Sequence, residues 1–307
     1  MSADWPFAIA VAPNGARRTK RDHPRLPISV DEIVRDAAEA LDAGAAMIHL
    51  HVRDRDGRHV LDADLYRDAM KAVRRETGDR LVVQITTEAV GLYGPAEQIA
   101  IIDTVMPESV SVALREVVPD GASEKAAAGL FERAWRAGML VQIIVYDPTE
   151  LMRIADLAAR GVIPTAHPPV LAVLGRYSGT GASEAELEAF LAGGISAYPW
   201  MLCAFGPGEA GYMGAGAGAG SHARVGFENN LHLPDGSTAP NNAALVAAAA
   251  EAAFGTGRRL ASAQELRRLW FTPPPRQWQR KPGHAHDAPG SSQTPDRANV
   301  QQKETQT

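Results

Sequence analysis

The sequence has one cysteine, Cys203, among 307 residues, and it has no long apolar run. A single cysteine cannot form a disulfide within the chain, so a disulfide-stabilised secreted fold is not expected. No apolar stretch approaches the roughly 20 residues that a membrane-spanning helix needs. The first residues, Met1 to Trp5, lack the basic and then apolar pattern of a signal peptide. We therefore expect a protein of a reducing compartment, the cytoplasm, without a membrane anchor.

The sequence also lacks a basic cluster interleaved with aromatic residues. Its formal net charge is -5 and its isoelectric point is about 6.0. This balance gives no general attraction for nucleic acid or for an anionic membrane. The hydrophobic content of 45% is enough for one large core, as in a single-domain α/β barrel. Small molecules are therefore the expected partners.

Short apolar runs alternate with helical patterns at intervals of roughly 30 residues, which is typical of repeated βα units. The predicted strands are Phe7–Ala12, Ala46–Val52, Leu81–Thr86, Ser109–Ala113, Leu140–Tyr146, Val170–Leu174, Ala197–Leu202 and Ala223–Phe227. The predicted helices are Val30–Ala43, Asp64–Glu76, Ala96–Val105, Glu124–Ala137, Thr149–Ala159, Glu184–Leu191, a Gly/Ala-rich stretch from Gly208, and Asn242–Ala253. Eight strand–helix pairs predict an α/β fold, a single (β/α)8 TIM barrel over residues 1–271. A doubly wound sheet is the alternative, although no Gly-x-Gly-x-x-Gly follows the first strand.

Two stretches have a biased composition. The alternating glycines and alanines of Gly214–Gly220 lack the Lys-Ser/Thr ending of a phosphate-binding loop. They favour a helix face of small residues packed close to the sheet, or a loop. Residues 272–307 are rich in Pro, Gln, Ser, Thr and His, which predicts a disordered, solvated tail. His284-Ala285-His286 lies in this tail with no strand beneath it, so we do not expect it to bind a metal.

An apolar run ends in a second His-x-His pair, His49 and His51. Because side chains alternate along a strand, both imidazoles point the same way and can share one metal ion. Active sites of TIM barrels lie at the carboxyl ends of the strands, where Glu228 follows the last predicted strand. Two imidazoles and one carboxylate leave an open position on a metal ion, as in catalytic zinc sites. The competing explanation for Glu228 is an ion pair with Arg224.

Other polar residues follow the same strand ends and are candidates for the same site. Arg224, Arg115 and Arg53 can each bind a carboxylate with two hydrogen bonds, although such arginines also pair with neighbouring acids. The further candidates are Asp54, Thr86, Thr87, Glu88, Glu116, Tyr146, Asp147, Asn229 and Asn230.

Three motifs, in this order, resemble the β-keto acid cleavage enzyme family: Gly44–Asp54, Val83–Gly91 and Arg224–Asn230. The resemblance extends from about the first predicted strand to Arg259–Ser262 and is similar in type to 3-keto-5-aminohexanoate cleavage enzyme. It implies a TIM barrel, usually a homotetramer, that holds a divalent metal, commonly zinc, with two histidines and one glutamate. These ligands correspond to His49, His51 and Glu228.

The resemblance also implies an activity. The family exchanges a β-keto acid with acetyl-CoA by a retro-Claisen route and gives acetoacetate and a new acyl-CoA. A metal would polarise the keto oxygen, and a base would remove a proton to begin the exchange. Arg224 matches a family arginine four residues before the metal-binding glutamate.

The sequence departs from the family where the substrate would bind. Asn229 stands where the family usually has an acidic residue, so the role of that acid as a base cannot be transferred to this chain. The usual Gly-Ala-Glu is Gly15-Ala16-Arg17, the usual Pro-Ser-Thr-Gly-Gly is Ile85-Thr86-Thr87-Glu88, and the acidic positions of the fifth strand are Gln142 and Ile144. We therefore expect Glu88 or Glu116 to act with Arg224 in catalysis. The expected substrate-binding residues are Thr86, Thr87, Arg115 and Asn229.

Three other functions stay open at this point. A metal-dependent lyase of the hydroxymethylglutaryl-CoA lyase kind needs an acidic ligand on the first strand, which reads only Ala8 to Ala12. An amidohydrolase needs further histidines, for which His167 and His222 are available. A catalytically silent barrel that binds metal and ligand is credible because Asn229 replaces the expected base.

Overall fold

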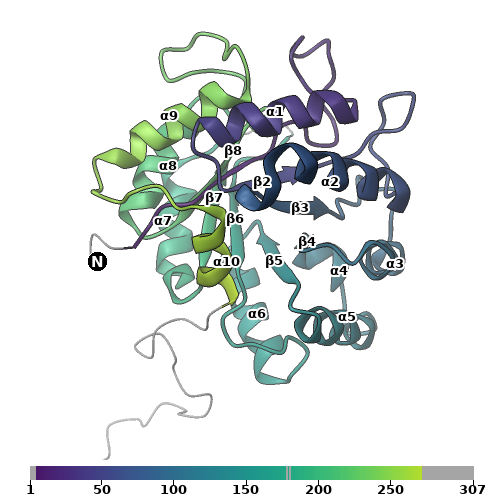
Figure 1. Cartoon of the computed structure of the whole chain (residues 1–307). Helices are drawn as coiled ribbons and strands as arrows, with labels where there is room; N and C mark the ends of the chain where they lie inside the picture. Colours follow the sequence, from purple (N-terminus) through teal and green to yellow (C-terminus); the bar gives the residue numbers. More distant parts are fainter. Residues whose placement is uncertain (1–4, 178, 180, 272–307) are drawn as a thin grey trace, which may run out of the picture.

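The computed structural model describes residues 5–177, 179 and 181–271 (Figure 1). In this part of the chain, eight parallel strands pair in sequence order and β8 pairs with β1, which closes the barrel. The strands are β1 (Ile9–Val11), β2 (Met47–Leu50), β3 (Val82–Thr86), β4 (Ser109–Ala113), β5 (Leu140–Val145), β6 (Val170–Leu174), β7 (Trp200–Ala204) and β8 (His222–Val225). The predicted TIM barrel is confirmed. The predicted tail and its His284 and His286 lie outside the described residues.

Helices surround the strands (Figure 1). The longer ones are α1 (Val30–Asp42), α2 (Ala63–Thr77), α3 (Pro95–Val105), α5 (Glu124–Arg136), α6 (Thr149–Ala159), α7 (Glu184–Ala192), α8 (Glu209–Gly218), α9 (Asn242–Phe254) and α10 (Ala263–Phe271). The short ones are α4 (Leu114–Val117) and the 3-10 turns η1 (Gly78–Arg80) and η2 (Ile195–Ala197). A capping box of Ser29 and Glu32 begins α1. Among the described helices, none is both long and apolar enough to cross a membrane.

The core has two layers, and alternation along each strand separates them. On β1, Ile9 and Val11 belong to the layer between strands and helices. Ala10 and Ala8, the residue just before β1, belong to the barrel interior. Leu266 and other residues of α10 join the interior layer beside residues from the strand starts, such as Val82. α10 therefore packs at the amino end of the barrel, and the carboxyl end is left for the site.

Some predicted boundaries differ from the structure. The seventh strand was expected at Ala197–Leu202 but runs over Trp200–Ala204, because η2 and then Pro199, which has no N–H, precede it. The eighth strand stops at Val225, two residues earlier than expected, where Gly226 turns the chain. The Gly/Ala-rich stretch forms α8, and a Cβ on Gly216 would lie 2.9 Å from Leu202 of β7. The prediction of a small-residue helix close to the sheet is confirmed.

Candidate metal centre and active site

Three buried side chains converge at the carboxyl end of the barrel. His49 lies on β2, His51 follows that strand, and Glu228 follows β8, which is separated from β2 only by β1. The Glu228 Oε2 atom lies 3.6 Å from His49 Nε2 and 3.4 Å from His51 Nε2. Potential ligand atoms of all three lie within 4.8 Å of one another. The described residues therefore form a compact group that could hold one metal ion.

The orientation of His49 is set by its neighbour on β3. Gln84 is in register with His49, and its amide group donates to Ser109 Oγ and Gln142 Oε1 at 3.2 Å each. The Gln84 Oε1 atom therefore accepts, at 2.8 Å, a hydrogen bond from His49 Nδ1. A proton on Nδ1 leaves the Nε2 lone pair free and directed toward His51 and Glu228. This is the tautomer that a metal ligand requires.

The main chain of His51 is fixed from the loop after β1. Asn14 donates from Nδ2 to the His51 carbonyl at 3.0 Å and accepts from the His51 N–H at 3.4 Å. The two Nε2 atoms of His49 and His51 lie 3.2 Å apart, and the buried Glu228 Oε2 has no hydrogen-bond partner. Converging lone pairs beside an unpaired carboxylate oxygen fit a cation better than any hydrogen-bond scheme.

The protonation states also suit a cation. Burial lowers the pKa of His49 to about 4 and that of His51 to about 3, so both imidazoles are neutral near pH 7. Burial by itself would raise the pKa of Glu228, but Arg224 and the two histidines outweigh it and hold this pKa well below its ordinary value. Two neutral imidazoles and one carboxylate are a ligand set for a divalent metal.

Arg224 supports the carboxylate from within the barrel. It is the third residue of β8, is buried, and donates from Nη2 to Glu228 Oε1 at 3.1 Å. One carboxylate oxygen is therefore held by the guanidinium, and the other faces the histidines. Both explanations of Glu228, the ion pair and the ligand, are compatible in this geometry.

The turn that carries Glu228 is held by buried polar groups that sequence patterns did not indicate. Gly226 has φ 138°, and a Cβ there would lie 2.4 Å from the Ala12 carbonyl oxygen, so only glycine fits. The Phe227 N–H donates to Asn242 Oδ1 at 2.8 Å, and the Gly226 N–H donates to Glu209 Oε1 at 3.3 Å. These partners come from α9 and α8, so their role depends on barrel closure.

The three side chains lie beside a cavity of about 790 Å³, which is lined by His49 and Glu228 among others. Of the other predicted site residues, Thr86, Glu88, Glu116, Arg224 and Asn229 also line it. This volume is in the range of pockets that bind small molecules.

A model of the family described as beta-keto acid cleavage enzyme matches residues 6–270. The chain belongs to the β-keto acid cleavage enzyme family. It is 29% identical over 267 residues to the 3-keto-5-aminohexanoate cleavage enzyme of Acetoanaerobium sticklandii, covering 85% of this chain and 96% of that protein. It is 27% identical over 289 residues to the 3-oxoadipate:acetyl-CoA acetyltransferase of Cupriavidus necator, covering 87% of this chain and 95% of that protein.

Solved structures show a similar fold. The ternary complex of ObcA with C4-CoA adduct and oxalate matches with a TM-score of 0.63 and 18% identity, over 80% of this chain and 67% of that one. A type I 3-dehydroquinate dehydratase from Clostridium difficile matches with a TM-score of 0.51 and 13% identity, over 73% of this chain and 85% of that one. At these identities the likeness supports only the barrel fold of this β-keto acid cleavage family member.

Two further carboxylates of this family member face the cavity near the candidate metal ligands His49, His51 and Glu228, which we call the metal group. Glu88 Oε2 lies 3.8 Å from His51 Nδ1, and Glu88 Oε1 lies 3.7 Å from Arg17 Nε. Burial, with repulsion from Glu228, raises the pKa of Glu88 to about 7. Glu116 accepts a hydrogen bond from the Ala89 N–H at 3.1 Å, and burial raises its pKa.

Two predicted substrate-binding residues lie elsewhere. The Thr87 hydroxyl lies 3.2 Å from Gln98 Oε1 and 3.3 Å from the Ser111 carbonyl oxygen, behind the cavity wall. Arg115 donates two hydrogen bonds of 3.0 Å to Glu150 and does not line the cavity. By contrast, Asn229 is fully buried at the cavity, and neither its Oδ1 nor its Nδ2 has a partner.

Several cavity residues were not among the predicted site residues, and four of them are Arg17, Arg18, Arg176 and Tyr177. These four come from the segments after β1 and β6, two strands whose ends offered no metal-binding pattern. Their positions agree with the rule that active sites of TIM barrels follow the strand ends.

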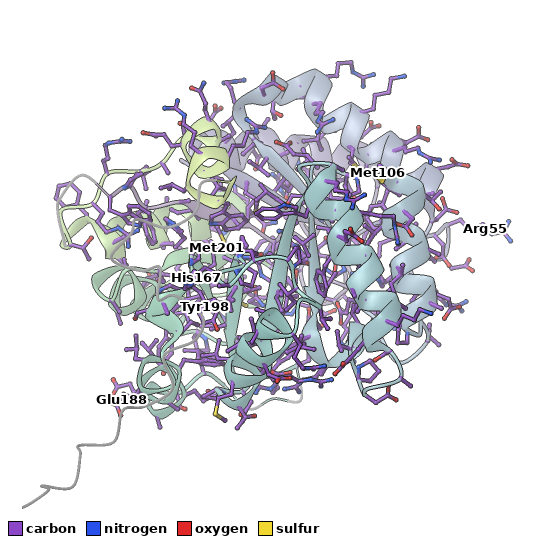
Figure 2. All side chains as sticks on the ribbon, turned by 90° about the horizontal axis from the view of Figure 1, so that it is seen from below. Arg55, Met106, His167, Glu188, Tyr198 and Met201 are labelled. Carbon is purple, nitrogen blue, oxygen red and sulfur yellow. The ribbon has the colours of Figure 1, made fainter. Side chains whose placement is uncertain are left out.

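The histidines that an amidohydrolase would need are at the wrong end of the barrel. His167 precedes β6, and its ring lies beside that of Tyr198, with centroids 6.1 Å apart (Figure 2). His222 is the first residue of β8, where its Nδ1 accepts the Ala8 N–H. Neither can reach the carboxyl end of the barrel, so the structure argues against this function. The lyase alternative requires an acidic ligand on β1, and β1 carries no acidic residue.

Gly15→Ala is expected to weaken metal binding at least about tenfold. Gly15 has φ +59°, and a Cβ would lie 2.7 Å from Glu228 Cγ and 2.8 Å from the Tyr177 hydroxyl. Gly57→Ala is the matched control, because Gly57 has φ +78° with nothing within 4 Å of its Cβ position. Both variants should lose about 1 kcal/mol from the positive φ. Equal metal affinity of the two variants, measured by titration, would show that Glu228 tolerates the contact.

Glu209→Gln is expected to change how stability depends on pH. Burial raises the pKa of Glu209 to about 8, so the folded protein keeps a proton that the unfolded chain loses near pH 4.5. The stabilising effect of this proton is full below pH 4.5 and is lost as the pH rises through 8. As the pH rises from 5 to 9, the free energy of unfolding of the variant should increase by on the order of 3 kcal/mol relative to that of wild type.

Urea unfolding at several pH values measures this effect. Glu188→Gln is the control, because Glu188 lies exposed on α7 (Figure 2). A stability difference between Glu209→Gln and wild type that stays constant with pH would mean that Glu209 is ionised in the folded protein.

Proposed function

We propose that this protein is a zinc-dependent enzyme that exchanges the acyl part of a β-keto acid with acetyl-CoA, giving acetoacetate and a new acyl-CoA. The observation that carries the proposal is the buried His49, His51 and Glu228 group beside the cavity, with Glu228 Oε2 unpaired. The name of the Cupriavidus necator relative, an acetyl-CoA acetyltransferase of 3-oxoadipate, supports the same exchange. Two imidazoles and one carboxylate suit zinc, and another divalent metal is compatible with them.

The exchange balances without an external oxidant or reductant. A base removes a proton from C2 of the keto acid, C2 bonds to the acetyl carbon, and the CoA thiolate leaves. The thiolate then attacks the C3 carbonyl, the C2–C3 bond breaks, and C2 regains a proton as acetoacetate forms. When bound, the metal supplies a Lewis acid that polarises the keto oxygen.

The protein's own groups suit the remaining tasks. Glu88 stands nearest the metal group and can take the C2 proton, whereas Glu116 is held by the Ala89 N–H and stands as the alternative base. The Thr86 Oγ1 atom already accepts the Glu88 N–H, so its own O–H can donate to substrate. The unpaired Asn229 amide can bind a substrate carboxylate, and Arg224 positions Glu228.

Metal analysis followed by turnover tests this proposal. Protein purified without chelators should contain close to one zinc per chain, and chelation should abolish acetoacetate formation from β-keto acids and acetyl-CoA. Chelation should also lower the melting temperature, since a metal at 100 times its Kd stabilises the folded state by about 2.7 kcal/mol. Metal-free purified protein, or a chelated protein that still turns over, would contradict the metal-dependent function.

A second candidate is a metal-binding barrel without turnover. Asn229 favours it, because an amide cannot act as a base in the place where the family usually has an acid. Binding of metal and acyl-CoA without acetoacetate formation would identify this function. The resemblance also predicts a homotetramer, which light scattering of the purified protein would test. The sequence composition predicts a cytoplasmic location, which fractionation of cells would test.

A further inference from the structure

The cavity wall is more apolar on one side than on the other, although Ser111, Glu116 and Arg176 also line the more apolar side. The more polar side comes from β2, β3 and β8 and carries the metal group, Glu88 and Asn229. The other side comes from β4 to β7. Its apolar side chains stand at or near the strand ends and are Ala113, Ile144, Val173 and Phe205. We call these four residues the apolar wall.

The apolar wall is continuous with the barrel interior. All four residues are buried and belong to one hydrophobic cluster, against which Tyr146 and Tyr177 also pack. Ile144 is in register with Ala113, and the rings of Tyr177 and Phe205 lie edge to face with centroids 4.6 Å apart. A ligand that reaches this side of the cavity therefore contacts packed hydrocarbon and ring faces.

The charged groups near the apolar wall already have partners. Arg176 donates to the carbonyl oxygens of Val173, Gly175 and Tyr146 and lies 3.6 Å from Glu186. Glu116 accepts the Ala89 N–H from the β3 side. On the opposite side, Arg18 donates to two carbonyl oxygens.

Among the arginines that line the cavity, Arg17 makes the weakest contacts with its neighbours. Its guanidinium lies over the Tyr177 ring at 5.0 Å from the centroid and 3.7 Å from Glu88. More than half of its side chain is exposed, at 56%. An anionic group bound there would compete with Glu88 and would remain in contact with water, so Arg17 favours such a substrate only weakly.

We infer that the β-keto acid has an uncharged hydrocarbon substituent on C3, and that this substituent lies against the apolar wall. This inference rests on the proposed function. A charged tail would lose its water against the hydrocarbon of Ile144 and Val173. A hydrocarbon tail gains roughly fourfold in binding for each buried CH2 group. The substrate class therefore differs from those named for the Acetoanaerobium sticklandii and Cupriavidus necator relatives, whose substrates carry an amine or a second carboxylate.

Three six-carbon acids separate these classes at equal chain length. They are 3-oxohexanoate, 3-oxoadipate and 3-keto-5-aminohexanoate, each supplied with acetyl-CoA to the zinc-loaded full-length protein. We expect kcat/KM for 3-oxohexanoate to exceed both others by about 10²-fold, because burial of an unpaired charge is costly. Equal values, or preference for a charged acid, would overturn the inference while leaving the proposed function intact. Acetoacetate from none of the three would overturn the proposed function and the inference with it.

Two variants of Ile144 test the contact itself. Ile144→Val and Ile144→Thr have nearly the same size but differ by a methyl and a hydroxyl group, so their comparison isolates polarity from volume. Relative to Ile144→Val, Ile144→Thr should lower kcat/KM for 3-oxohexanoate roughly fivefold. It should leave the values for the two charged acids unchanged or raised. Identical substrate profiles of the two variants would mean that the tail does not touch this wall.

Val173→Thr repeats the comparison on the neighbouring strand. It exchanges a methyl for a hydroxyl at constant size and is compared with wild type directly. The same selective loss for 3-oxohexanoate is expected, and metal content measured alongside shows that the site is otherwise intact. A uniform loss for all three acids would overturn the assignment of Val173 to the tail-binding wall.

Discussion

Replacement of His51 by alanine is expected to abolish stoichiometric zinc binding and to lower acetoacetate formation by at least about 10³-fold. The loss follows because a Lewis acid contributes several kcal/mol to the stabilisation of developing charge. His51 supplies one of two nitrogen atoms that converge on Glu228 Oε2, and the remaining pair cannot complete a catalytic zinc site. Metal content and kcat are measured on the same preparation.

His59→Gln is the matched control. The ring of His59 lies 5.0 Å from that of His51, is buried to a similar degree, and bonds through Nε2 to the Glu88 carbonyl oxygen at 3.2 Å. Glutamine retains a donor for that carbonyl, and His59 belongs to no metal-binding group among the described residues. His51→Ala protein that keeps full zinc content, or His59→Gln protein that loses it, would contradict the assigned ligand set.

The fold was predictable because the pattern of the chain is repetitive. Buried parallel strands read as apolar runs, so Val170–Leu174 was predicted with the observed bounds. The seventh strand was predicted too early in the chain, because residues 195–202 are apolar enough to continue a strand in either direction. Only the backbone of η2 and Pro199 decides where that strand begins.

The metal-binding group was predictable for a different reason. A His-x-His pair at the end of a strand places two ligands locally, and barrel closure brings the residue after β8 to β2 across a single strand. The sequence could not indicate Gln84, Asn242 or Glu209, because their hydrogen bonds join residues 15 to 35 positions apart on separate elements.

Strand-end position alone also could not sort the substrate-binding candidates. Thr86 and Thr87 are adjacent, yet side chains alternate, so Thr86 faces the cavity and Thr87 faces Gln98 of α3. Arg115 lies on the short helix α4, which directs it to Glu150 on α6. This single helical turn was not predicted, and it directs Arg115 away from the cavity.

Glu88→Gln is expected to lower kcat by about 10² to 10⁴-fold, the usual range for loss of a general base, while zinc content stays unchanged. The geometry carries this expectation, because Glu88 faces the cavity beside the metal group and Asn229 cannot accept the C2 proton. Glutamine keeps the size of the side chain and removes the charge that pairs with Arg17. Turnover and metal content are measured together.

Glu116→Gln is the matched comparison, since Glu116 lines the same cavity but already accepts the Ala89 N–H. Its effect on kcat should be under about tenfold, because an amide oxygen can still accept that hydrogen bond. A larger loss in Glu116→Gln than in Glu88→Gln would transfer the base to Glu116. Full turnover in both variants would exclude both carboxylates as the general base. Another group would then have to remove the proton in place of the family's missing acid.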